Sequence, residues 1–139
     1  MYDIELWHVE PDGMVTAAGL TGVPISGIRK LVQRWLIAFL QDPDSKLYKH
    51  RRIPYGTYFM PQLRKGMMRS EMDVVGGFAL SRAMVRGALE SEQRPTDPPD
   101  ELYKDSTLNK IELMPGQMHL HITIESHVDQ MDIVLPIAV

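Results

Sequence analysis

Two histidines separated by one residue, near the end of the chain, are the residues best placed for metal chemistry. His119 and His121 are one residue apart, so in a β-strand both imidazoles would lie on the same face, together with Glu125. Two histidines and a carboxylate can form part of a metal site, provided that a third ligand is correctly placed. The same alternation arises on the solvated face of any strand, and we therefore predict no metal site here.

Paired carboxylates that could hydrolyse a glycosidic bond are the second possibility. Glu90 and Glu92 are candidates, but they lie beside an acidic, proline-containing segment, and such chemistry needs a buried carboxyl group with a raised pKa. The sequence has no G-x-S-x-G, P-loop or G-x-G-x-x-G motif. It has no cysteine, which excludes thiolate ligands, disulfides and cysteine nucleophiles. We predict that the protein is not an enzyme, with no catalytic residues and no cofactor.

The composition is that of a single globular domain. The chain has 139 residues, of which 44% are hydrophobic, enough for one core. We predict one domain over residues 1–139. No apolar run approaches the length of a membrane span, and the first residues do not resemble a signal peptide, so we expect neither.

Opposite charges are concentrated in two segments. Lys46–Arg69 contains seven of the fifteen Lys and Arg residues and no acid, whereas Glu90–Asp105 contains six acids and two bases. These are either solvated loops or two patches that dock on different neighbours. Arginine and aromatic residues are favoured in interfaces, so we predict that the basic segment docks on an acidic partner. The expected contact residues are Lys49, Arg51, Arg52, Tyr55, Tyr58 and Phe59. A net charge of −3 argues against nucleic acid as that partner.

The stretch Ser26–Gln41 predicts the central helix that must support these surfaces. Eight apolar residues between Ile28 and Leu40 cover an arc of roughly 200° on a helical wheel, about twice the stripe of a surface helix. Such a helix packs on more than one neighbour. Ile37 falls in the middle of the polar side, where it is either an incidental exposed residue or a contact with a partner subunit.

Alternation and turn residues predict the elements before and after this helix. Residues 2–9 alternate as a strand, and residues 14–17 can pair back onto it. The basic stretch is expected to be a loop with a short extended piece around Tyr58. A second helix should run from Ser70 to about Glu92, with a loose capping box at its start.

The C-terminal third predicts a three-stranded meander. Leu108–Met114 and Gln117–Glu125 flank Pro115-Gly116 as a β-hairpin, and Asp132–Val139 is a last strand. The fold class is therefore α+β, with two main helices packed on an N-terminal β-hairpin and a C-terminal three-stranded antiparallel sheet.

The last strand is a candidate docking element. Its apolar residues alternate, so one of its faces must be buried; they are Ile133, Leu135, Ile137 and Val139. A strand at the edge of a sheet would offer free N–H and C=O groups to another chain, and Pro136 removes only one donor. The alternative is a strand that is fully paired within its own sheet.

The order of these elements resembles a known family. From about Gly19 to Val139 the chain resembles the small baseplate wedge protein, or sheath initiator, of contractile phage tails and its relatives in type VI secretion baseplates. The matching segments are Leu31-Val32-Gln33-Arg34, Phe39-Leu40-Gln41-Asp42-Pro43-Asp44-Ser45, Arg52-Ile53-Pro54-Tyr55-Gly56 and Ala83-Met84-Val85-Arg86-Gly87-Ala88-Leu89. Two features depart from the family: the loop lacks a residue between proline and the aromatic, and Asp100–Asp105 replaces a Glu-Pro-Arg signature.

The resemblance implies a structural virion protein of the tail baseplate, made in the host cytoplasm and present in several copies in a symmetric ring. Its implied partners are the tail sheath protein and other wedge proteins, with the tail tube or hub as a further candidate, and neither nucleic acid nor membrane. It further implies that sheath strands pair with Gln117–Glu125 and Asp132–Val139 by β-augmentation. The expected contacts are His119, His121, Ile133, Val134, Leu135, Ile137 and Val139.

Two other functions remain open on the sequence. One is another small tail protein, such as a head–tail connector or terminator. The other, less favoured, is a metal-dependent or lysozyme-like hydrolase, a label that some family members carry although the residues here do not support it.

Overall fold

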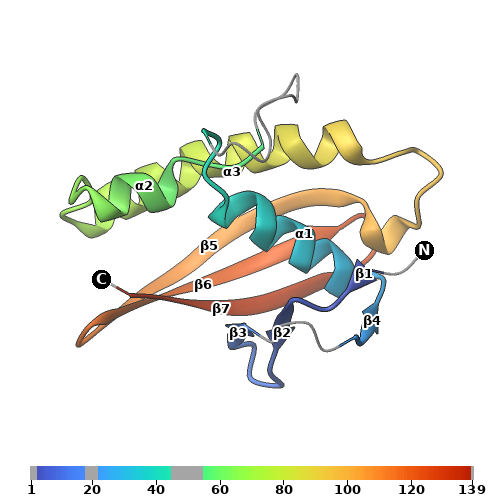
Figure 1. Ribbon diagram of the computed structural model, residues 1–139, viewed down its shortest axis with the longest axis horizontal. Coiled ribbons are helices and arrows are strands. Elements are labelled where there is room, and N and C mark those ends of the chain that lie inside the picture. Colours follow the sequence, from blue (N-terminus) through green and yellow to red (C-terminus); the bar gives the residue numbers. More distant parts are fainter. Residues whose placement is uncertain (1–2, 18–21, 45–54, 139) are drawn as a thin grey trace. The chain divides into compact units, whose positions relative to one another are not determined.

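The computed structural model of the chain describes residues 3–17, 22–44 and 55–138. In chain order the elements are β1 (Asp3–Ile4), β2 (Trp7–Val9), β3 (Val15–Ala17), β4 (Pro24–Ile25), α1 (Ile28–Leu40), α2 (Phe59–Arg64), α3 (Glu71–Glu92), the 3-10 helix η2 (Pro99–Glu101), β5 (Tyr103–Met114), β6 (Gln117–Ser126) and β7 (Gln130–Ala138) (Figure 1). The fold class is α+β, as predicted. The chain divides into two compact units, residues 1–33 with 95–139 and residues 34–94.

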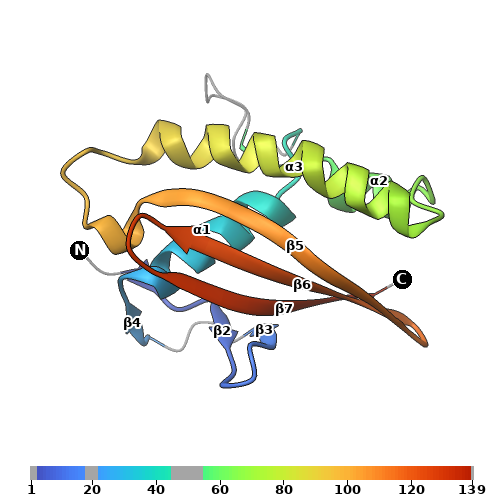
Figure 2. The ribbon, with the colours of Figure 1, turned by 180° about the vertical axis from the view of Figure 1, so that it is seen from behind.

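The first unit contains a three-stranded antiparallel sheet. Its strand order is β5-β6-β7, so β6 is the central strand (Figures 1 and 2). Alternate side chains of β6 and β7 are buried on one face, namely Met118, Leu120, Ile122, Ile124, Ile133, Leu135 and Ile137. The predicted meander and its alternation are confirmed, except that β5 begins at Tyr103 rather than Leu108.

Two short ribbons stand where the sequence predicted one N-terminal hairpin. β2 pairs with β3, which confirms the hairpin, and β1 pairs with β4. The single strand predicted over residues 2–9 is wrong, because the chain leaves β1 at Glu5 and Leu6. The Glu5 amide donates to the Val23 carbonyl oxygen at 2.8 Å, and the next two amides bond a glutamine side chain instead of a strand.

Helix α1 confirms the predicted core helix and most of its apolar arc. Leu31, Val32, Trp35, Leu36, Ala38 and Phe39 are all buried. Two polar residues outside that arc, Lys30 and Gln33, are also buried. Lys30 Nζ lies 2.8 Å from Glu101 Oε1 of η2. This carboxylate offsets the cost of burying the ammonium group.

The second unit has an aromatic core. The Trp35 and Phe39 rings stack with centroids 4.8 Å apart, and the Phe39 ring also contacts Phe59 and Phe78. The predicted extended piece around Tyr58 is wrong, since helix α2 begins at Phe59. Pro61 falls in the first turn of α2, where no backbone N–H is required.

Helix α3 confirms the predicted second helix and its N-terminal cap. The Asp73 amide donates to Ser70 Oγ at 3.2 Å, and Asp73 Oδ2 accepts from the Arg69 amide at 2.9 Å. This is a capping-box arrangement in which the shorter aspartate bonds the residue before the cap. The helix continues through Gly76 and Gly77 to Glu92.

Candidate assembly interface

The central position of β6 changes the expected docking geometry. Main-chain groups of β6 face β5 on one side and β7 on the other. An incoming strand therefore cannot pair with Gln117–Glu125, and that part of the prediction is wrong. Strand addition to this sheet requires the outer edge of β5 or of β7.

The outer edge of β7 is covered at its middle by the turn between β2 and β3. The Val134 amide donates to the Gly13 carbonyl oxygen at 2.8 Å, and Met14 forms a parallel bridge with Val134. A Cβ on Gly13 would lie 3.0 Å from the Asp132 carbonyl oxygen, so the turn approaches β7 closely. By alternation the remaining outward-facing residues toward the chain end are Pro136, which has no N–H, and Ala138.

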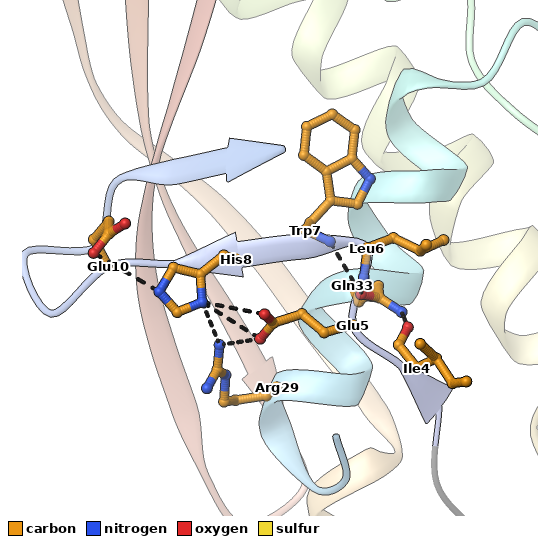
Figure 3. A network of polar contacts seen from close by, with 8 residues as sticks. All are labelled: Ile4, Glu5, Leu6, Trp7, His8, Glu10, Arg29 and Gln33. Carbon is orange, nitrogen blue, oxygen red and sulfur yellow. Dashed lines mark hydrogen bonds and ion pairs between the residues drawn. The ribbon is translucent and has the colours of Figure 1, made fainter. Parts of the chain in front are cut away.

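A glutamine side chain holds the N-terminal segment on α1. Gln33 Oε1 accepts from the Leu6 amide at 2.7 Å and from the Trp7 amide at 3.2 Å, while Gln33 Nε2 donates to the Ile4 carbonyl oxygen at 2.9 Å (Figure 3). The buried side-chain amide of Gln33 thus supplies hydrogen bonds to three backbone groups that do not bond a neighbouring strand. This contact fixes where β2, and with it the β2–β3 turn, begins.

An ionic cluster lies beside this glutamine clamp. The Arg29 guanidinium is 2.9 Å from Glu5 Oε2, and His8 Nδ1 is 3.3 Å from Glu5 Oε1 (Figure 3). His8 Nε2 also lies 3.7 Å from Glu10 Oε2. The buried Glu5 carboxylate therefore has a cationic partner, which offsets the cost of removing it from water.

β5 pairs with β6 in two regular stretches, residues 105–108 and residues 110–114, of which the second ends at the hairpin tip. Register shifts interrupt β5 between Tyr103 and Asp105 and between Leu108 and Lys110. Beyond the second shift, residues 110–114 pair regularly with β6. Because Met114 and Gln117 close the two-residue turn, Ile111 and Leu113 direct their peptide groups away from β6. The Leu113 side chain is 70% exposed.

The polar face of the sheet brings the two predicted histidines near different partners. His121 Nε2 hydrogen bonds Glu112 Oε1 of β5, whereas His119 Nε2 lies 3.0 Å from Gln117 Oε1. The hydrogen bond from His121 lowers the pKa of Glu112 from its ordinary value of 4.5. Burial opposes this with a smaller effect, and the Lys110 cation lowers the pKa further. Within residues 3–17, 22–44 and 55–138, no three His, Asp or Glu side chains are arranged to hold a metal ion.

The basic segment is only partly described. Lys49, Arg51 and Arg52 lie outside the described residues. Tyr55 and Phe59 are buried, so of the expected aromatic contacts only Tyr58 is exposed, with 43% of its surface accessible. The Thr57 hydroxyl donates to the Phe39 carbonyl oxygen at 2.6 Å, which ties this segment to the end of α1.

The apolar contact residues expected on β7 point into the sheet's own core. Ile133, Leu135 and Ile137 are buried, Val134 is half-buried, and Val139 lies outside the described residues. The side chain of Ile37, expected on the open polar side of α1, is half-buried.

The acid pair shows no glycosidase geometry. The Glu90 carboxylate is exposed and lies 3.4 Å from Arg86 Nη1, one helical turn earlier. Glu92 belongs to the last turn of the same helix. The Glu90 side chain is 54% exposed and lacks the burial that the acid catalyst of such a pair needs.

Sequence reasoning missed the glutamine clamp and the outward face of α3. Gln33 was assigned to the polar side of a helix, and nothing local distinguishes a clamp from a solvated glutamine. A helical wheel of residues 71–92 would have found apolar residues on both sides of α3.

Comparisons with protein-family models, with curated proteins and with solved structures gave no match for this chain. None of the helices in the described ranges is long and apolar enough to cross a bilayer.

Proposed function

We propose that this chain is a structural assembly protein of a contractile tail baseplate, which joins the wedge to the sheath and starts sheath polymerisation by strand addition. The proposal rests on the sequence resemblance and on the order of elements. The first helix, the basic segment, the second helix and the closing meander follow one another as that family would require. The expected location is the baseplate of the virion.

The observation that carries the proposal is the regular edge of β5 at residues 110–114. Ile111 and Leu113 direct donors and acceptors outward there, and a strand of another chain could pair with both. The edge of β7 is a poorer template, since Gly13 occupies the Val134 amide and Pro136 has no donor. We therefore assign strand addition to β5 rather than to the last strand.

The test compares two substitutions of one residue. Leu113→Pro removes the outward N–H, whereas Leu113→Ala keeps the N–H and removes only the exposed side chain. Both should leave the monomer folded, because proline is tolerated at an edge strand whose N–H faces outward. Far-UV circular dichroism of each purified variant checks this.

Baseplates assembled with each variant are then incubated with sheath protein and viewed by electron microscopy. We expect sheath to nucleate on baseplates with Leu113→Ala and not on those with Leu113→Pro. Normal sheath growth on the proline variant would contradict strand addition at β5. Failure of the wild-type chain to enter baseplates would contradict the proposed function as a whole and favour a connector or terminator.

A further inference from the structure

Helix α3 is apolar on two opposite sides. The residues Val74, Phe78, Ser81, Val85, Ala88 and Leu89 are buried and share one side. On a wheel of about 100° per residue, an opposite arc of roughly 140° contains Met72, Val75, Gly76, Ala79, Leu80, Ala83 and Gly87. The ion pair of Arg86 and Glu90 lies within the same arc, toward the end of the helix. Between Met72 and Ala83 this arc holds no charged residue, and an apolar helix face is normally covered.

This opposite arc, which we call the outer face of α3, is exposed. Met72 is 85% exposed, Leu80 70% and Val75 52%. Each of these is a large apolar side chain that would be stabilised by removal from water, and together they extend over just over two turns of one helix. Contiguous apolar surface of this kind marks an interaction site.

The sizes of the side chains along the outer face suggest an antiparallel partner. Large residues, Met72 and Val75, lie toward the start of α3, and the small residues Ala83 and Gly87 lie toward its end. If two copies of α3 pair antiparallel with Ala79 at the twofold axis, Val75 of each copy lies level with Ala83 of the other. Val75 then fits over Ala83, and the small Ala79 at the axis allows the two helices to approach closely.

Two charged residues of α3, Glu71 and Arg86, would be complementary in this antiparallel register. On the wheel Arg86 lies within the outer face, about 20° from Ala79, and Glu71 lies about 80° from Ala79 in the same direction, at the other end of α3. In an antiparallel pair related by a twofold axis, like flanks face each other. Glu71 of one copy then lies within one residue of the level of Arg86 in the other, and the symmetry produces this contact twice.

We propose that the outer face of α3 binds a second copy of this chain, as an antiparallel, twofold-symmetric helix pair centred on Ala79. Arg86, which already contacts Glu90 of its own helix at 3.4 Å, would gain Glu71 of the partner as a second carboxylate. The inference concerns the isolated protein and does not depend on the proposed function.

The test is a charge exchange measured by sedimentation velocity over a range of concentrations. Glu71→Arg and Arg86→Glu should each weaken the dimer about tenfold or more, because each reversal turns two attractive contacts into repulsive ones. The double variant E71R/R86E should recover wild-type association. Ala79→Glu should give a monomer, since it places two carboxylates together at the twofold axis. Lys104→Glu, an exposed reversal on β5, serves as the control and should still dimerise.

Three outcomes would overturn the proposal. They are a monomeric wild-type chain at all concentrations, a dimer that Ala79→Glu does not dissociate, and a dimer that both single reversals weaken but the double variant does not restore. Circular dichroism of each variant separates loss of association from loss of folding.

Discussion

At the scale of single residues, the contact between His121 and Glu112 makes a prediction about pH. The hydrogen bond lowers the pKa of Glu112 in the folded protein relative to the unfolded chain. The ionised Glu112 carboxylate therefore stabilises the folded protein. This stabilisation is complete above the pKa of Glu112 in the unfolded chain and is lost as pH falls through its lower pKa in the folded protein. We expect His121→Phe to raise the titration midpoint of the Glu112 carboxyl, measured by carbon NMR, toward its ordinary value.

His119 provides the matched control for that titration. It lies on the same strand and directly opposite Glu112 in the β5–β6 register, but its Nε2 hydrogen bonds Gln117 and not the Glu112 carboxylate. His119→Phe should therefore leave the Glu112 midpoint close to that of the wild type. Equal shifts in both variants would mean that the general charge of the face, and not the hydrogen bond from His121, lowers the pKa.

Residue-scale roles were the hardest to predict from the sequence. The apolar arc of α1 was predictable, because helical periodicity determines which side is buried. The burial of Lys30 and Gln33 was not, since it depends on Glu101 and on the backbone of residues 4–7, which are distant in sequence. The need for glycine at position 56 was equally unpredictable, because it depends on a distant part of the chain. Gly56 has φ +128 and lies so close to the Gln41 carbonyl oxygen that a Cβ would overlap it.

At the scale of elements, the long periodic segments were predictable and the short ones were not. α3 and the strands β6 and β7 follow directly from period and turn residues. The six-residue helix α2 was missed because Pro61 suggested a break, although its place in the first turn permits a helix. The strand expected over residues 2–9 divides because Gln33 takes two of its amides.

The β2–β3 turn makes a prediction about how β7 is protected. Gly13 has φ +91 and a close neighbour in the Asp132 carbonyl oxygen, whereas Gly116 has φ +76 and open space around it. Gly13→Ala should cost about 1–3 kcal/mol through strain at positive φ and more through this contact, and Gly116→Ala should show only the strain. Urea denaturation measures both.

Hydrogen exchange at Val134 supplies the direct readout. If the turn covers the edge of β7, Gly13→Ala should speed hydrogen exchange of the Val134 amide, because this amide donates to the Gly13 carbonyl oxygen in the wild type. Gly116→Ala should leave that rate nearly unchanged. Equal exchange rates at Val134 in the two variants would show that the turn does not protect this edge.

At the scale of the whole molecule, helix α1 belongs to both compact units. Its 13 residues are divided between Gln33 and Arg34, so each unit holds about half of the helix. An isolated helix shorter than about 12–15 residues is marginal in water, and half of α1 would not persist alone. The single domain predicted from the sequence therefore requires the two units to unfold together.

The two tryptophans allow this cooperativity to be measured unit by unit. Trp7 lies in the unit of residues 1–33 and 95–139, and Trp35 is fully buried in the unit of residues 34–94. Trp35→Phe leaves Trp7 as the only tryptophan, and Trp7→Phe leaves Trp35, so that selective excitation of tryptophan reports one unit at a time. Within each variant we expect the urea midpoint from fluorescence to coincide with the midpoint from far-UV circular dichroism, because a two-state transition gives the same midpoint with every probe. If either tryptophan reports a midpoint different from that of circular dichroism, the units unfold separately, and the shared helix does not make them one cooperative domain.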